Sequence, residues 1–147
     1  MISAMLPATV SRMDRQAVIT ALREYFAGRP DVVAAYLFGS VARDEARAGS
    51  DVDVAVLLRA GAPRQLGDYD ALFALQDDLA ERLHRPVDVV AANDAPLDLL
   101  HRVLRDGVLV HDLDPRRRAE FELNVRTQYF DFLPVLLRYR QLVLRGA

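Results

Sequence analysis

Apolar residues recur at two different periods along the chain, and the alternation of these periods predicts helices separated by short strands. Helical spacing covers residues 14–27, 69–83 and 96–105. Short runs rich in β-branched and aromatic residues, typical of buried strands, cover residues 32–38, 52–58, 87–91 and 108–110. A brief helix is predicted over residues 40–47, and a long final helix from residue 114 to residue 144.

Some helix boundaries carry chemical signals of their own. Asp114 and Pro115 form a strong helix start, because an acceptor side chain precedes a proline whose missing N–H costs nothing at the first helical position. Gly107 follows the helix at 96–105 and is predicted to close it in a left-handed conformation. Pro134 lies inside the final helix and is predicted to kink or divide it, because proline removes one backbone hydrogen bond.

The alternation of helices and strands predicts an α/β fold in which helices cover a small sheet. The 147 residues, 52% hydrophobic and 27% charged, suffice for one buried core but not comfortably for two. We therefore expect a single domain over residues 1–147, with a core at about 14–111 and a C-terminal helical extension at about 114–145.

Charge and composition exclude several classes of function. The net charge of -2 provides no general basic field, so we expect no direct nucleic-acid partner. All 19 basic residues are Arg, which favours forked contacts to phosphate or carboxylate, and the absence of Cys excludes disulfides and thiolate chemistry. No apolar run approaches the length of a membrane span and the N-terminal segment lacks a targeting pattern, so we expect a cytoplasmic protein.

Gly39 and Ser40 lie where the predicted strand at 32–38 gives way to a short helix, a place where backbone N–H groups converge and attract phosphate. Gly39 lets the backbone come close, and Ser40 either caps the helix or donates its hydroxyl to a phosphate oxygen. Arg43 lies one turn on and reaches the same anion. Taken alone, glycine and serine here also fit a simple turn with a capping serine.

Asp51 and Asp53 share one face of the strand at 52–58, because side chains two residues apart point the same way, while Val52 and Val54 occupy the opposite face. Two carboxylates held side by side repel each other unless a divalent cation binds between them. Magnesium suits this position, since it takes oxygen ligands and completes its shell with substrate phosphates. The alternative for an isolated pair is a solvated strand edge.

Asp88 is the one charge in the apolar run at 86–90, where a buried strand normally tolerates none. If this strand lies beside the strand at 52–58, Asp88 either joins Asp51 and Asp53 around two metal ions or accepts the proton of an attacking hydroxyl. By itself, Asp88 would be only a residue at the entry of a strand.

Together these residues resemble the nucleotidyltransferase superfamily typified by DNA polymerase beta, whose pattern is a strand, GS, a short helix, a strand with DxD and a third Asp on a later strand. The resemblance implies a small mixed sheet flanked by helices, in which GS holds ATP and DxD binds two Mg²⁺ ions. It also implies that an acceptor attacks the α-phosphorus, so that pyrophosphate leaves. The matching residues are Gly39, Ser40, Asp51, Asp53 and Asp88.

Asp44 is a departure from this pattern, because close relatives more often carry glycine after the arginine of this loop. A carboxylate beside the phosphates repels them. We therefore expect Asp44 to weaken nucleotide binding.

The tail from Arg117 to Tyr139 resembles that of MntA-type antitoxins, which are minimal nucleotidyltransferases encoded beside HEPN-domain toxins. Polymerases and aminoglycoside-modifying members carry further domains for their second substrate, whereas this chain ends soon after the core. The resemblance implies transfer of AMP from ATP to a tyrosine of a cognate HEPN toxin, a candidate RNase, within a hetero-oligomer of antitoxin and toxin. The alternatives are nucleotidyl transfer to a small hydroxylated compound such as an aminoglycoside, and non-catalytic inhibition of the toxin by occlusion.

The apolar residues of the tail form two sets. The first recurs at helical spacing, which is typical of a core-facing stripe: Phe121, Val125, Phe130, Leu133, Leu137 and Val143. The second lies outside that stripe and is a candidate partner surface: Tyr129, Phe132, Leu136 and Tyr139.

Overall fold

A computed structural model describes residues 14–47, 50–59 and 66–146 of the chain. Its sheet has four strands in the order β3-β2-β1-β4, with β1 antiparallel to β2 and β4, and β2 parallel to β3. The strands are β1 (Val32–Phe38), β2 (Val52–Leu58), β3 (Val87–Ala91) and β4 (Val108–Asp112). This mixed sheet, flanked by helices, confirms the expected fold class. The opening segment, in which no targeting pattern was expected, lies outside the described residues.

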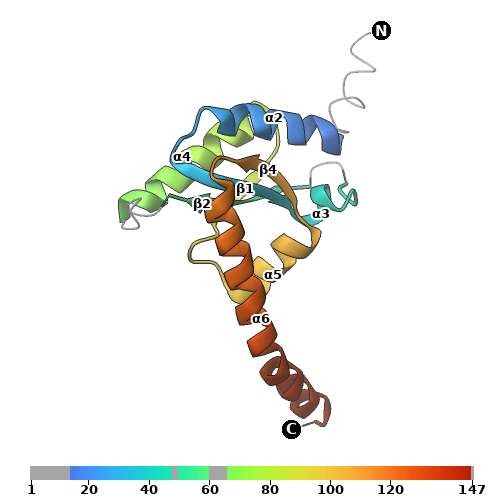
Figure 1. Ribbon diagram of the computed structural model, residues 1–147. Helices are drawn as coiled ribbons and strands as arrows, with labels where there is room; N and C mark the ends of the chain where they lie inside the picture. The colour runs from blue at the N-terminus through green and yellow to red at the C-terminus, as the bar shows by residue number, and fades with distance from the viewer. Residues whose placement is uncertain (1–13, 48–49, 60–65, 147) are drawn as a thin grey trace.

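The helices form a layer on each face of the sheet (Figure 1). On one face lie α2 (Arg15–Ala27) and α4 (Leu66–Leu83), and on the other lie α5 (Leu97–Asp106) and α6 (Pro115–Leu144), while the short α3 (Gly39–Ala42) follows β1. Alternate residues of each strand supply the two cores. Val52, Val54 and Val56 of β2 are buried on the α2 and α4 side, whereas Ala55 and Leu57 are buried on the α5 and α6 side.

The ends of three helices show which sequence signals acted as predicted. Asp114 accepts a hydrogen bond from the backbone N–H of Arg117 at 3.1 Å, so the predicted start of the last helix is confirmed. The brief helix predicted over residues 40–47 is shorter in the structure, where α3 ends at Ala42. Gly107 closes α5 in an extended conformation (φ -77°, ψ 164°), so the predicted left-handed cap is wrong. Glycine is still needed there, since an added Cβ would overlap the carbonyl oxygen of Val103.

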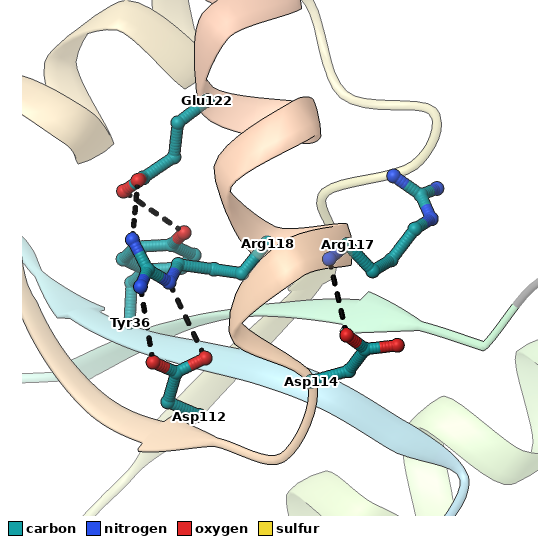
Figure 2. Close-up of polar contacts among 6 residues, drawn as sticks. All are labelled: Tyr36, Asp112, Asp114, Arg117, Arg118 and Glu122. Carbon is teal, nitrogen blue, oxygen red and sulfur yellow. Dashed lines mark hydrogen bonds and ion pairs between the residues drawn. The ribbon is translucent and has the colours of Figure 1, made fainter.

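Polar contacts fix the base of α6 to the sheet (Figure 2). Arg118 donates hydrogen bonds to Asp112 of β4 at 3.1 and 3.3 Å and to Glu122 at 2.8 Å. Glu122 also accepts a hydrogen bond from the hydroxyl of Tyr36 on β1, at 3.3 Å. Burial, and then the neighbouring Glu122 carboxylate, raises the pKa of Tyr36, which keeps this hydroxyl protonated as a donor.

Beyond its base, α6 extends away from the sheet (Figure 1), and much of the predicted core-facing stripe is exposed. Val125 is buried and Phe121 packs against the core, whereas Phe130 is 71% exposed and Val143 54% exposed. The next turn of the helix is still covered, because Tyr129 stacks on His101 of α5. The stripe is wrong beyond Tyr129, where most of its residues are exposed. Pro134 does not divide α6, since the carbonyl that it frees lies on a solvent-exposed segment where water can bond to it. None of the described helices is long and apolar enough to cross a membrane.

Candidate active site

Three aspartates lie near the beginnings of β2 and β3 and influence one another electrostatically. Asp53 is paired in register with Asp88 of β3 on one side and with Phe38 of β1 on the other. Paired residues of neighbouring strands direct their side chains to the same face, so Asp53 and Asp88 share the face that α5 covers. The expectation that the third carboxylate lies beside the DxD strand is confirmed by this register.

The carboxylates affect each other electrostatically. Burial, reinforced by the Asp88 and Asp51 carboxylates, raises the pKa of Asp53 to about 6, from an ordinary value of 3.8. The Arg43 guanidinium acts in the opposite direction and lowers it. Asp51 and Asp88 are exposed, whereas Asp53 is partly buried between them. The site therefore carries more negative charge than its one nearby arginine balances.

This charge and the oxygen donors fit a hard divalent cation such as Mg²⁺, which prefers carboxylate and phosphate oxygens. The three side chains are electrostatic neighbours rather than a closed ligand cage. Across residues 14–47, 50–59 and 66–146, no three His, Cys, Asp or Glu side chains are gathered as a metal-binding cluster. An open arrangement of this kind leaves positions for substrate phosphates, which Mg²⁺ requires in nucleotide sites.

Gly39 connects the GS motif to these carboxylates. Its φ of +77° lies in the left-handed region that glycine adopts readily. A Cβ at this position would also overlap the carboxylate of Asp53. Two independent constraints, one of backbone conformation and one of space, therefore require glycine between β1 and α3.

Ser40 lies within α3, and the N-cap residue of this helix is Phe38, with no side-chain capping bond. The interpretation of Ser40 as the helix cap is therefore wrong. Its backbone carbonyl accepts a hydrogen bond from the N–H of Glu45 at 2.8 Å, which folds the following loop back over α3. The other interpretation, in which the Ser40 hydroxyl donates to phosphate, stays a prediction.

The loop after α3 holds the two charged residues that the sequence placed near the phosphates. Arg43 pairs with Glu45 at 3.1 Å at the surface, and its charge is felt by Asp53. Asp44 has a φ of +58°, in the left-handed region where glycine is favoured and aspartate is tolerated. Glycine would adopt this backbone conformation with less strain than Asp44 does.

Arg85 is a positioning residue that the sequence did not single out. Its guanidinium donates a hydrogen bond to the carbonyl of Ser50 at 2.7 Å, directly before Asp51. The next backbone bond, from the N–H of Val52 to the carbonyl of Pro86, is 2.9 Å long. These two contacts fix the start of β2 against the start of β3 and thereby set the spacing of the carboxylates. Arg85 precedes the strand of Asp88, but no sequence signal pairs it with Ser50.

Comparison with known proteins agrees with this architecture. Residues 20–116 match the family described as Polymerase beta, Nucleotidyltransferase. The match spans more than half of the 147 residues, so the chain belongs to this nucleotidyltransferase family. No curated protein sequence matches the chain.

Solved structures extend the likeness over most of the chain. A chain of a toxin-antitoxin complex with AMP-PNP is 24% identical with a TM-score of 0.64, over 91% of this chain and 98% of that chain. A chain from the complex of tri-AMPylated Shewanella oneidensis HEPN toxin with MNT antitoxin is 23% identical with a TM-score of 0.58, over 92% and 97%. A candidate minimal nucleotidyltransferase is 35% identical with a TM-score of 0.52, over 67% and 97%. The first two likenesses establish shared fold alone.

Proposed function

We propose that this chain is the antitoxin of a toxin-antitoxin pair and acts as an ATP- and Mg²⁺-dependent protein adenylyltransferase, transferring AMP to a tyrosine of a cognate HEPN toxin. The observation that carries the proposal is the in-register pairing of Asp53 with Asp88 beside Gly39, which places a pair of carboxylates next to a candidate phosphate turn. Membership of the nucleotidyltransferase family supports the reaction type.

The site residues divide the work of nucleotidyl transfer. Gly39 and Ser40 hold the triphosphate through the backbone and hydroxyl of the turn, and Arg43 neutralises part of its charge. Asp51, Asp53 and Asp88 would hold Mg²⁺ through their carboxylate oxygens. Bound Mg²⁺ would offset the charge of the triphosphate and of the departing pyrophosphate.

The transfer breaks a phosphoanhydride bond of ATP and forms a phosphoester bond to the acceptor. The tyrosine oxygen forms a bond to the α-phosphorus, and the bond from this phosphorus to the pyrophosphate oxygen breaks. The phenolic proton passes to Asp88, which lies at the side of the cluster away from Gly39. The products are tyrosyl-AMP on the toxin and free pyrophosphate.

A protein acceptor is supported by the exposed half of α6. Large apolar side chains on this segment remain uncovered, including Phe130, Leu137 and Val143 at 71%, 48% and 54% exposure. Extended exposed apolar surface of this kind marks sites of protein contact. The structural neighbours support the partner class, because they are chains of toxin-antitoxin complexes, one with an AMPylated HEPN toxin.

The test is incubation of the purified chain with α-labelled ATP, Mg²⁺ and the HEPN-domain protein encoded beside it. We expect label on a tyrosine of the toxin, identified by mass spectrometry. Label should disappear with the double variant Asp51→Asn, Asp53→Asn and persist with the control Asp31→Asn, which lies at the far end of β1. Unlabelled toxin, or full labelling by the double variant, would refute the proposal.

Inhibition by occlusion is a second candidate, favoured by the same exposed half of α6. In that case binding alone silences the toxin, and the aspartates have no role in neutralisation. Cells that express the toxin separate the two functions. Protection by the double aspartate variant equal to that by the wild type indicates occlusion, whereas loss of protection with retained binding indicates catalysis.

A further inference from the structure

A pocket of about 440 Å³ lies beside β3, between α4 and α5. Its volume falls within the roughly 300–1,000 Å³ of small-ligand sites. The lining is mostly apolar, with Phe73 of α4 and Leu99 of α5 on opposite sides, and Asp88 is one of its few polar residues. Phe73 is 58% exposed, so an aromatic ring lies at the surface of this pocket without cover.

The backbone of β3 leaves this side of the sheet open. The carbonyl of Pro86 accepts a hydrogen bond from Val52 of β2, and the N–H of Ala92 donates one to Val56 of β2. Between these two residues, the backbone N–H and C=O groups of the even-numbered residues therefore point toward β2. The backbone N–H of Val89 points away from β2 and donates a hydrogen bond to the side-chain oxygen of Gln76 at 3.0 Å rather than to another strand. Since β3 is an end strand of the described sheet, the pocket follows a strand edge that a ligand can approach.

The pocket and the phosphate turn lie on opposite sides of the carboxylates. Across the sheet, Phe38 next to Gly39 pairs with Asp53, and Asp53 pairs with Asp88. Asp88 also lines the pocket, whereas Gly39, Ser40 and Arg43 do not. The order is therefore phosphate turn, Asp53, Asp88 and pocket, which is the order in which donor, reacting phosphorus and acceptor must lie.

We propose that this pocket is the acceptor subsite, and that it takes the side chain of the accepting tyrosine, with its ring between Phe73 and Leu99 and its hydroxyl at Asp88. This rests on the proposed adenylyl transfer and adds the subsite that selects the acceptor. The lining is mostly apolar, which suits a phenyl ring, and the Asp88 carboxylate suits the hydroxyl group that the ring carries. Most of the lining residues are apolar, and a polycationic sugar would leave that apolar surface uncovered, so the pocket favours an aromatic acceptor over an aminoglycoside.

A first experiment tests the pocket without the toxin. N-acetyl-tyrosinamide is titrated into the ¹⁵N-labelled chain in the presence of Mg²⁺ and AMP-PNP, and amide shifts are followed by NMR. We expect shifts at Phe73, Val90 and Leu99 that N-acetyl-phenylalaninamide produces more weakly, because it lacks the hydroxyl. Absence of shifts in this pocket overturns the assignment. Equal shifts produced there by AMP-PNP alone also overturn it, because they show that the pocket holds the adenine base of the nucleotide.

A second experiment uses the transfer reaction. Phe73→Ala removes one wall of the pocket, and Leu113→Ala is the matched control, an exposed apolar residue beside the opposite edge of the sheet. We expect Phe73→Ala to raise KM for the toxin at least about tenfold, the worth of one apolar group in a pocket, with KM for ATP changed less than about twofold. An unchanged KM for the toxin overturns the pocket while leaving adenylyl transfer intact. A wild-type chain that labels no toxin refutes the transfer itself, and the NMR titration then decides the pocket.

Discussion

The raised pKa of Asp53 predicts that the protein is destabilised by its own active-site charge. Asp53→Asn keeps the shape of the side chain and removes the ionisation. In the unfolded chain this carboxyl loses its proton near its ordinary value of 3.8, whereas in the folded protein it does so at about 6. Between these values the folded state binds more protons than the unfolded state, so the free energy of unfolding falls as pH rises. The stability present below pH 4 is lost as pH passes through 6.

The size of the effect follows from the pKa. A pKa of about 6 in place of 3.8 corresponds to about 3 kcal/mol at neutral pH in a fully coupled site. Asp53 is only partly buried, and solvent screening reduces the expected gain for Asp53→Asn to about 1 kcal/mol. For a chain of this size, about 1 kcal/mol corresponds to a rise in Tm of about 2–4 °C.

Urea denaturation followed by circular dichroism tests this prediction at pH 7.5 and pH 4.5 without divalent cations. Asp53→Asn should be more stable than the wild type at pH 7.5 and nearly equal to it at pH 4.5. Asp131→Asn, an exposed carboxylate on α6, should change nothing at either pH. Added Mg²⁺ should stabilise the wild type and have little effect on Asp53→Asn. The reasoning is refuted if the variant gains nothing at pH 7.5, or gains the same amount at both pH values.

Three other substitutions test separate parts of the structure. Gly39→Ala forces a Cβ into the Asp53 carboxylate at a positive φ, so we expect a loss of about 1–3 kcal/mol in urea denaturation together with loss of nucleotide transfer. Asp44→Gly relieves a left-handed aspartate and removes a charge near the phosphates, so KM for ATP should fall while stability changes by less than about 1 kcal/mol; a higher KM would contradict this. Arg118→Met removes three hydrogen bonds at the base of α6, so we expect the free energy of unfolding to fall by about 1–3 kcal/mol. An unchanged melting curve would contradict this.

Much of the fold was predictable because local rules agree with the final structure. Strand alternation predicted the face of β2 that carries Asp53, and an apolar run with a single charge identified Asp88 as a residue needing a partner. The shared face of Asp51 stays a prediction, because this residue precedes β2. The pairing of β2 with β3 then follows from the sheet order. The roles of these residues in catalysis stay predictions, because register and charge describe what a site can hold rather than what it does.

Other features depend on contacts between distant segments and left no local signal. Arg85 reaches the carbonyl of Ser50 only once two strands lie side by side. The same holds for the overlap that a side chain at position 39 would make with Asp53. The pocket next to Asp88 depends on how α4 and α5 pack around an edge strand. Periodicity in the last helix indicated an apolar face, but periodicity does not encode whether the same chain covers that face. Beyond Tyr129, most of the apolar residues on that face are exposed.

The length of α6 bears on how strongly the acceptor subsite needs to bind. The helix has 30 residues and is about 45 Å long, and its base is fixed to β4 and β1, away from the edge strand β3. A partner held by the outer half of this helix is tethered to the enzyme before its tyrosine reaches the pocket. Tethering raises the local concentration of that tyrosine to the millimolar range on a short flexible link. A weakly binding pocket is then sufficient: the helix selects the partner protein, and the pocket selects the side chain that accepts the nucleotide.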